Sequence, residues 1–161
     1  MKLKSIFLVI IINLIIFSFI TFSSIKSHLT TNNEINTYLK QKDSLCVGLL
    51  SLPSINYQAC LYNLEDYHNN LDYGVTILQT NPWVIVGHSG HGSKAVFNSL
   101  FKLHIHDHII ISYYHETTNY ETTNIYYYHK KQSLPLNNSL FLATCSLINI
   151  HEQLIISAKK I

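Results

Sequence analysis

Residues 139–158 read SLFLATCSLINIHEQLIISA, and this stretch holds two short apolar runs on either side of a polar break. Runs of this length, rich in Leu and Ile and bounded by polar residues, are typical of buried β-strands. We therefore predict one strand at 139–145 and a second at 153–158. Cys145 ends the first of them, so a nucleophilic side chain is expected at a strand end.

Apolar runs of the same kind recur along the chain from Leu45 onward, separated by polar or Pro/Gly breaks. The further strands that we predict lie at 45–51, 55–62, 83–87, 108–114 and 123–128. Short helical turns are expected at 64–71 and 95–102. Several short strands at such intervals indicate an all-β sandwich or barrel, and the helical segments are too few and too short for a doubly wound α/β fold.

The N-terminal segment is apolar enough to cross a membrane. Residues 5–22 carry no charged side chain, and this run of 18 residues is close to the roughly 20 that a spanning helix needs. Lys2 and Lys4 precede it, so the positive-inside rule predicts a cytoplasmic N-terminus at 1–4 and an extracellular C-terminal domain, as in a single-pass cell-membrane protein. A cleaved signal peptide is the alternative, with 22–24 as the nearest cleavage site, but its apolar core is usually shorter.

The rest of the chain divides into a stalk and one domain. Residues 23–43 are polar and predict a stalk with a short helix across 34–42, and residues 44–161 contain all the predicted strands. With 47% hydrophobic and only 12% charged residues, the chain is not of the disordered class. The 11 basic and 9 acidic side chains nearly balance, which gives no electrostatic basis for binding nucleic acid.

Two strand ends carry residues that can form a thiol nucleophile. Leu142–Cys145 reads Leu-Ala-Thr-Cys, and Val86–His88, which reads Val-Gly-His, closes the run at 83–87. The thiolate is the reactive form of Cys, and a neighbouring imidazole supplies the charge or proton transfer that makes it usable. The spacing alone is a weak signal, because the chain contains ten His.

The motifs taken together resemble those of the sortase family. Four blocks match in order: residues 47–56 (VGLLSLPSIN), Leu61-Tyr62 followed by Leu71 and Gly74, residues 84–88 with residues 97–100, and residues 142–145. The resemblance covers about residues 46 to 158. It implies a closed β-barrel of about eight strands with one or two short helices, preceded by the N-terminal transmembrane helix.

The resemblance implies a cysteine transpeptidase. Sortases cleave an LPxTG-like sorting signal near the C-terminus of a secreted protein through a Cys thioacyl intermediate, which an amine of the cell wall or of a pilin subunit resolves. Cys145 matches the nucleophile, and His88 matches the residue that protonates the leaving amine and deprotonates the incoming one. Thr144 and Ala143 match positions that shape the substrate-binding site. The family match implies no cofactor and no metal.

The chain departs from the family at the catalytic Arg of the last strand. Gln153 occupies that place, and the chain contains no Arg at all. A Gln amide donates hydrogen bonds without charge, and losing one oxyanion donor typically costs about 10²–10³ in rate. We therefore expect a slower enzyme, with His151 as a second candidate donor. The alternative is a surface protein on the same barrel that binds a sorting-signal peptide without cleaving it.

Residues 87–92, Gly-His-Ser-Gly-His-Gly, resemble the Gly-x-Ser-x-Gly motif of serine hydrolases but do not match it, because position 91 is His and the glycines stand at 90 and 92. This leaves Ser89 as a less favoured nucleophile.

Two further clusters have simpler interpretations than a ligand site. Residues 104–108, His-Ile-His-Asp-His, have chelating side chains at alternate positions, yet we expect a solvated turn and the start of a strand. The tyrosines at 113–114 and 126–128 fit barrel faces or a subunit contact better than a ligand platform.

Cys46 and Cys60 remain. If the strands predicted at 45–51 and 55–62 pair as a hairpin, the two Cys lie nearly opposite each other, and a disulfide is conceivable in an exported domain. Two unpaired, half-buried thiols are the alternative, which we favour because the sequence does not fix the register. Cys145 must stay reduced in either case.

Overall fold

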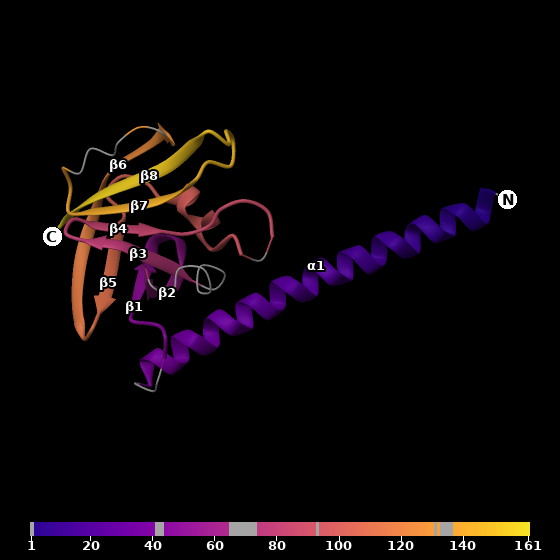
Figure 1. Ribbon diagram of the computed structural model, residues 1–161, viewed down its shortest axis with the longest axis horizontal. Coiled ribbons are helices and arrows are strands. Elements are labelled where there is room, and N and C mark those ends of the chain that lie inside the picture. Colours follow the sequence, from indigo (N-terminus) through magenta and orange to yellow (C-terminus); the bar gives the residue numbers. More distant parts are fainter. Residues whose placement is uncertain (1, 41–43, 65–73, 93, 131, 133–136) are drawn as a thin grey trace.

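The computed structural model describes residues 2–40, 44–64, 74–92, 94–130, 132 and 137–161. Figure 1 shows a long N-terminal helix that leads into a β-barrel. The elements are helix α1 (Lys2–Leu39), 3₁₀ helices η1 (Pro53–Ile55) and η3 (Val96–Lys102), and strands β1 (Gly48–Leu52), β2 (Tyr57–Asn63), β3 (Val75–Thr80), β4 (Trp83–Val86), β5 (His108–Tyr113), β6 (Glu116–His129), β7 (Leu140–Cys145) and β8 (Glu152–Lys160).

Helix α1 is continuous from Lys2 to Leu39, so the polar segment expected to be a stalk is helical as far as Leu39. Within it, Phe7–Leu39 has a mean hydropathy of 2.5 over its most apolar window and is long and apolar enough to cross a membrane. The apolar side chains from Phe7 to Phe22 are exposed. The last turns pack on the barrel, where Ile35 is buried and Tyr38 packs beside it.

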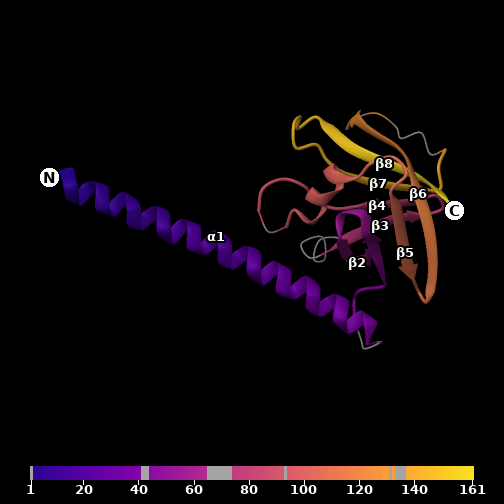
Figure 2. The same cartoon turned by 180° about the vertical axis from the view of Figure 1, so that it is seen from behind.

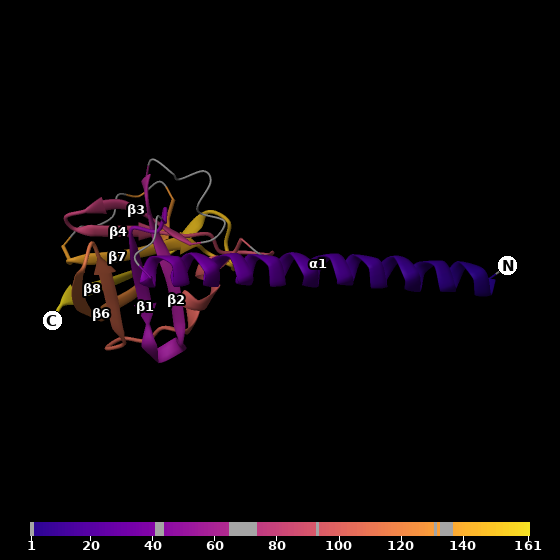
Figure 3. The same ribbon diagram turned by 90° about the horizontal axis from the view of Figure 1, so that it is seen from below.

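The eight strands close into a barrel, as the family resemblance implied. Their order around the barrel is β1-β2-β3-β4-β7-β8-β6-β5. Most neighbours are antiparallel, but β2 pairs with β3 and β4 pairs with β7 in parallel. Figures 2 and 3 show α1 leaving the barrel at β1 and β2 and projecting beyond it.

Seven of the eight strands lie where the sequence predicts a strand, with shifted ends. β3 (Val75–Thr80) was missed, and β6 is much longer than the run predicted at 123–128. The turn expected at 95–102 is a 3₁₀ helix, η3. The turn expected at 64–71 lies largely outside the described residues.

The interior of the barrel is the main core. Side chains at alternate positions of each strand point inward, and they include the fully buried Leu50, Leu61, Ile85, Leu142 and Ile156. Phe97 of η3 packs into the same cluster and has no exposed surface. A one-residue slip of any strand would turn this set outward, so the register is strongly specified.

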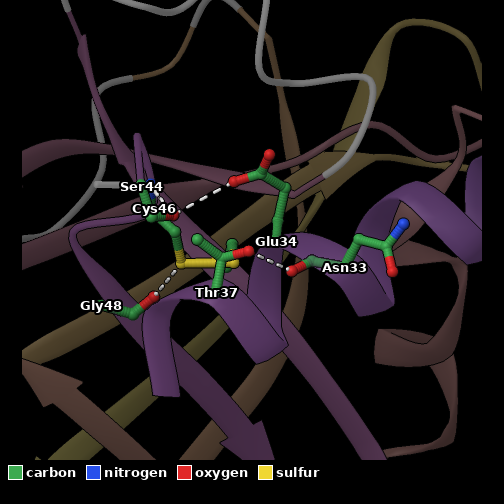
Figure 4. Close-up of a disulfide and its surroundings, with 7 residues drawn as sticks. Asn33, Glu34, Thr37, Ser44, Cys46 and Gly48 are labelled. Atoms are coloured by element: carbon green, nitrogen blue, oxygen red, sulfur yellow. Dashed lines mark hydrogen bonds between the residues drawn. A yellow bond between two sulfur atoms is a disulfide. The ribbon is translucent and has the colours of Figure 1, made fainter. Parts of the chain in front are cut away.

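A disulfide joins Cys46 and Cys60, with a Cα–Cα distance of 5.4 Å (Figure 4). The interpretation as two free thiols is therefore wrong. The register of β1 and β2 supplies the reason. Leu49 pairs with Cys60, and the backbone amide of Val47 donates to Leu61 O, so the chain is still alongside β2 at Cys46. Both Cys are buried, under the end of α1.

The turn into β1 is also tied to α1. Ser44 Oγ donates a hydrogen bond to Glu34 Oε2 at 3.1 Å and accepts one from the amide of Cys46 at 3.1 Å, as Figure 4 shows. The disulfide, the Ile35 contact and this bond therefore fix the last turns of α1 against the outer face of β1 and β2.

Replacing Tyr57 with Phe is expected to stabilise the barrel. The hydroxyl oxygen of Tyr57 is fully buried, no described residue hydrogen-bonds it, and burial raises the pKa of this phenol. Removing a buried, unsatisfied polar atom should raise the free energy of unfolding by about 1 kcal/mol. Thermal unfolding of Tyr57→Phe beside the parent chain measures this.

Thr122→Val tests the same effect at a second site, because Thr122 Oγ1 is also buried without a hydrogen-bond partner among the described residues. A drop in stability for Tyr57→Phe would contradict the prediction and show that the hydroxyl is bonded.

Candidate active site

Strands β4 and β7 run side by side in parallel and end together. Val86 is in register with Ala143. Beyond that pair, the amide of Gly87 donates to Ala143 O at 3.3 Å, and Thr144 Oγ1 donates to Gly87 O at 2.8 Å. The next residues along the two strands are His88 and Cys145, so the two chemistry-bearing residues of the sequence lie at the same end of neighbouring strands.

Cys145 lies directly opposite Gln153 of the antiparallel strand β8. The amide of Ser146 donates to Glu152 O, which makes the preceding Cys145–Gln153 pair a non-hydrogen-bonded one. In such pairs the Cα atoms are only about 4.5 Å apart and the side chains lie close together on one face. Cys145 is an exposed, free thiol, and no described residue hydrogen-bonds the half-buried Gln153 side chain.

The row continues onto β6, where Tyr128 is in register with Gln153. Cys145, Gln153 and Tyr128 therefore form one line across three strands on the outer face of the barrel, and we call this line the catalytic row. His88 follows β4 on the other side of Cys145.

An apolar patch lies beneath this row on the same outer face. It consists of Val84, Phe141, Ala143 and Ile155, with Val86, Tyr126 and Tyr128 packed against them. The rings of Tyr126 and Tyr128 have centroids 5.0 Å apart and are tilted by 56°. Burial raises the pKa of the Tyr126 phenol. Val84, Phe141, Ala143 and Ile155 are themselves buried, so the patch is a small second core on the outer face next to Cys145.

His88 and the segment after it are held by a backbone amide and a side chain of η3. The amide of Phe97 donates to His88 O at 2.8 Å. Asn98 brackets Gly90, accepting from its amide at 3.0 Å and donating to its carbonyl at 2.9 Å. Gly90 and Gly92 have φ of 130° and 106°, a left-handed backbone that favours Gly.

Ser89 links this segment to β7, because its Oγ donates to the carbonyl oxygen of Cys145. Among the described residues no His or carboxylate hydrogen-bonds this hydroxyl. The arrangement gives Ser89 no base that would activate it, and it holds the ends of β4 and β7 together.

The turn between β7 and β8 is tight and well bonded. Ser146 Oγ accepts from the amides of Ile148 and Asn149 at 3.2 and 3.1 Å. Asn149 Nδ2 donates to Glu152 Oε1, and Asn149 Oδ1 accepts from the amide of His151, both at 3.0 Å. These bonds fix the positions from which Cys145 and Gln153 leave the turn.

The other candidates of the sequence lie elsewhere. His151 is in the β7–β8 turn, and its ring stacks on that of His129 with centroids 6.3 Å apart. Residues 104–107 form a turn, and His108 begins β5. In this turn, Asp107 Oδ2 accepts a hydrogen bond from the amide of His104 at 2.8 Å, and His106 Nδ1 lies 2.9 Å from Glu121 Oε1. The described residues contain no group of three His, Cys, Asp or Glu side chains placed to hold a metal ion.

Two contributions were not anticipated from the sequence. Asn98 stands in a motif that the family resemblance uses, but only the folded chain gives it a role at Gly90. Tyr126 and Tyr128 were expected to line a barrel face, and they do, but that face leads to Cys145 because β6 is a neighbour of β8.

Replacing Gly87 with Ala is expected to lower both stability and activity. A Cβ at this position would lie 2.8 Å from two ring carbons of Phe97 and 2.9 Å from a methyl of Val75. Overpacking of this kind costs about 1–3 kcal/mol. Because the amide of Phe97 bonds to His88, the displaced ring should also move the imidazole, and misplacement by an ångström can cost about 10²-fold in rate.

Thermal unfolding and peptide cleavage by Gly87→Ala would measure the two effects, and the double variant with Phe97→Leu should recover part of the activity. Unchanged cleavage by Gly87→Ala would show that His88 is not positioned through Phe97.

Comparisons with known proteins agree with the fold of the barrel. Residues 50–161 match the family model of the sortase domain. Similar solved structures include sortase A from Corynebacterium diphtheriae (TM-score 0.65, 23% identity, 76% of this chain and 63% of that one) and sortase C-1 from Actinomyces oris (TM-score 0.65, 20% identity, 88% and 98%). Sortase C1 from Streptococcus agalactiae matches with a TM-score of 0.65 and 22% identity over 75% and 70%. At these identities the likeness concerns the fold. A search of curated proteins finds no match.

Proposed function

The chain belongs to the sortase family, and on this premise we propose that it is a membrane-anchored cysteine transpeptidase acting on proteins that carry an LPxTG-like sorting signal. The observation that supports the proposal is the common end of β4, β7 and β8, where Cys145 pairs with Gln153 and His88 follows two residues after the Val86–Ala143 pair. The site needs no cofactor for the chemistry described below.

In the proposed reaction, the Cys145 thiolate attacks the carbonyl carbon of the scissile peptide bond, and a tetrahedral intermediate forms. His88 gives a proton to the departing amine as the C–N bond breaks, which leaves a thioester on Sγ. An acceptor amine of the cell wall or of a pilin subunit then attacks the thioester and loses its proton to His88. The thiol is regenerated, and the two proteins are joined by an amide bond.

Gln153 is proposed as the donor to the oxyanion. Its side chain lies on the same face as Cys145 and is free of described hydrogen-bond partners, so its amide can donate to the negative oxygen of the intermediate. A neutral donor stabilises that charge less well than a guanidinium, because charge-assisted hydrogen bonds are about twice as strong.

The exposed edge of the apolar patch is the proposed place for the substrate. Ala143, the residue of the patch nearest to Cys145 on β7, is buried, and the half-buried rings of Tyr126 and Tyr128 pack against the patch. An extended peptide with apolar residues before the scissile bond could lie against these rings. Thr144 has a positioning role, since its hydroxyl ties β7 to Gly87.

A catalytically inactive peptide-binding protein is the second candidate, and Gln153 is the observation that favours it. In that case the same place would still bind the sorting signal, but no thioester would form.

The anchor completes the proposal. We place α1 across the cell membrane with Lys2 and Lys4 on the cytoplasmic side and the barrel outside, following the positive-inside rule.

Intact mass of the full chain in detergent micelles, incubated with a pool of LPxTG-like peptides, tests the function. A gain equal to the acyl fragment of one peptide, reversed by hydroxylamine, is expected for a thioester. A chain whose Cys145 has first been alkylated is the control. Peptide binding without a mass gain would favour the inactive binder.

A further inference from the structure

We propose that the turn between β7 and β8 is a membrane-contacting loop that holds the catalytic row against the lipid surface in which α1 is anchored. This inference rests on the proposed anchoring of α1 but not on catalytic activity. The occupant that it assigns to the loop is the phospholipid bilayer.

The loop presents three aliphatic side chains to solvent. Leu147, Ile148 and Ile150 are 49%, 86% and 76% exposed. They occupy three of four consecutive positions, and residues 146–151 carry no acidic side chain. Isolated exposed aliphatic residues are normal on a protein surface, but a contiguous group of them marks an interaction site.

Their exposure is built into the turn. Ser146 Oγ accepts hydrogen bonds from the amides of Ile148 and Asn149, and Asn149 bonds to Glu152 and His151. The side chains of Ser146 and Asn149 thus bond within the turn, and the aliphatic side chains are left outside.

The anchor places this end of the barrel next to the membrane. One cleft is lined both by helix residues from Ser24 to Leu39 and by Gly92, Ala95 and Ser99 of the barrel. Ser24 lies only two residues beyond the end of the apolar run at Phe22, which is about 3 Å along a helix. The barrel segment that follows His88 therefore borders a cleft that extends up to the membrane-proximal part of α1.

The β7–β8 loop projects from the same end. Ser89 bonds to the carbonyl of Cys145, which joins the segment after His88 to the base of the loop. In Figures 1 and 3 both connections project toward the N-terminal side of α1, whereas the β5–β6 turn lies at the opposite end of the barrel. A bilayer around the apolar part of α1 would thus meet the aliphatic loop first.

The bilayer suits the loop chemically. Aliphatic side chains enter the boundary between headgroups and acyl chains, and cationic neighbours favour anionic headgroups. Lys130 lies next to the loop, since its amide bonds to His151 O. With the loop inserted, Cys145 and Gln153, which flank it directly, would work at the lipid surface.

Fluorescence of the full chain in phosphatidylcholine vesicles tests the proposal. Ile148→Trp puts a reporter at the tip of the loop, and Tyr114→Trp puts one in the β5–β6 turn, where Tyr114 is 58% exposed. The single natural Trp, Trp83, pairs with Tyr113 at the other end of β4 and supplies the baseline. Acyl-brominated phosphatidylcholine quenches only indoles that reach the acyl region.

The emission of the introduced Trp is the emission of the variant minus that of the parent chain, which contains only Trp83. We expect brominated lipid to lower this emission by roughly half for Ile148→Trp and to leave it unchanged for Tyr114→Trp. No quenching of Ile148→Trp, or equal quenching of both variants, would overturn the proposal. A blue shift of Ile148→Trp on adding a sorting-signal peptide, without quenching by lipid, would also overturn it and assign the loop to the substrate. The readout needs no turnover, so it fails or succeeds independently of the proposed activity.

Discussion

Replacing Cys145 with Ala is expected to abolish the thioester adduct and to lower peptide cleavage by roughly 10⁴-fold or more, because the reaction then has no nucleophile. The side chain is exposed at the end of β7, so the substitution should leave the barrel folded. Intact mass and cleavage of a fluorogenic sorting-signal peptide, measured beside thermal unfolding, would separate loss of chemistry from loss of structure.

Ser89→Ala is the matched control for Cys145→Ala. It removes only the hydrogen bond to the carbonyl of Cys145, which is worth about 0.5–1.5 kcal/mol, and should therefore reduce cleavage by no more than about tenfold. The reverse pattern, with cleavage kept in Cys145→Ala and lost in Ser89→Ala, would show that the chain is a serine hydrolase.

Replacing Gln153 with Arg is expected to raise kcat/KM for peptide cleavage by roughly 10²-fold. Position 153 faces Cys145 in a close cross-strand pair, and its side chain is half-buried with no described hydrogen-bond partner. An Arg there would bring a charged donor to the developing oxyanion, where one donor is typically worth about 10²–10³ in rate. Steady-state kinetics on the same peptide would measure the gain.

Gln153→Lys and Gln153→Ala bracket the effect. Lys adds the charge without the planar fork of a guanidinium and should give a smaller gain, and Ala should reduce cleavage below that of the parent chain. Equal rates for all four chains would show that position 153 does not contact the reacting carbonyl. An adduct seen only in Gln153→Arg would identify the parent chain as a binder.

Much of the barrel could be predicted from local pattern. The strands at 139–145 and 153–158 were expected almost where β7 and β8 lie, because each has a mainly apolar run bounded by polar residues. β3 was missed because only its first half is buried and the rest is exposed, which leaves too short an apolar run. The first half of β6, which begins at Glu116, was missed because its Thr, Asn and Glu side chains alternate on a partly solvated face.

The candidate site was predictable only in part. Cys145 and His88 could be singled out because each ends an apolar run, and Gln153 because the family has Arg there. The partners that support them come from pairings between distant segments. Tyr128 reaches the catalytic row because β6 lies beside β8, and the Cys46–Cys60 disulfide depends on the exact register of β1 and β2. Neither pairing leaves a local signal in the sequence.

The place of β8 between β6 and β7 has a consequence for how the barrel is assembled. Until residues from Glu152 onward have emerged, β6 and β7 each lack a neighbour and present an open edge of unpaired amides and carbonyls. Such edges recruit other chains, and contacts between distant segments form slowly. β8 pairs with both strands, so the arrival of the last nine-residue strand closes both edges in one step and completes the barrel.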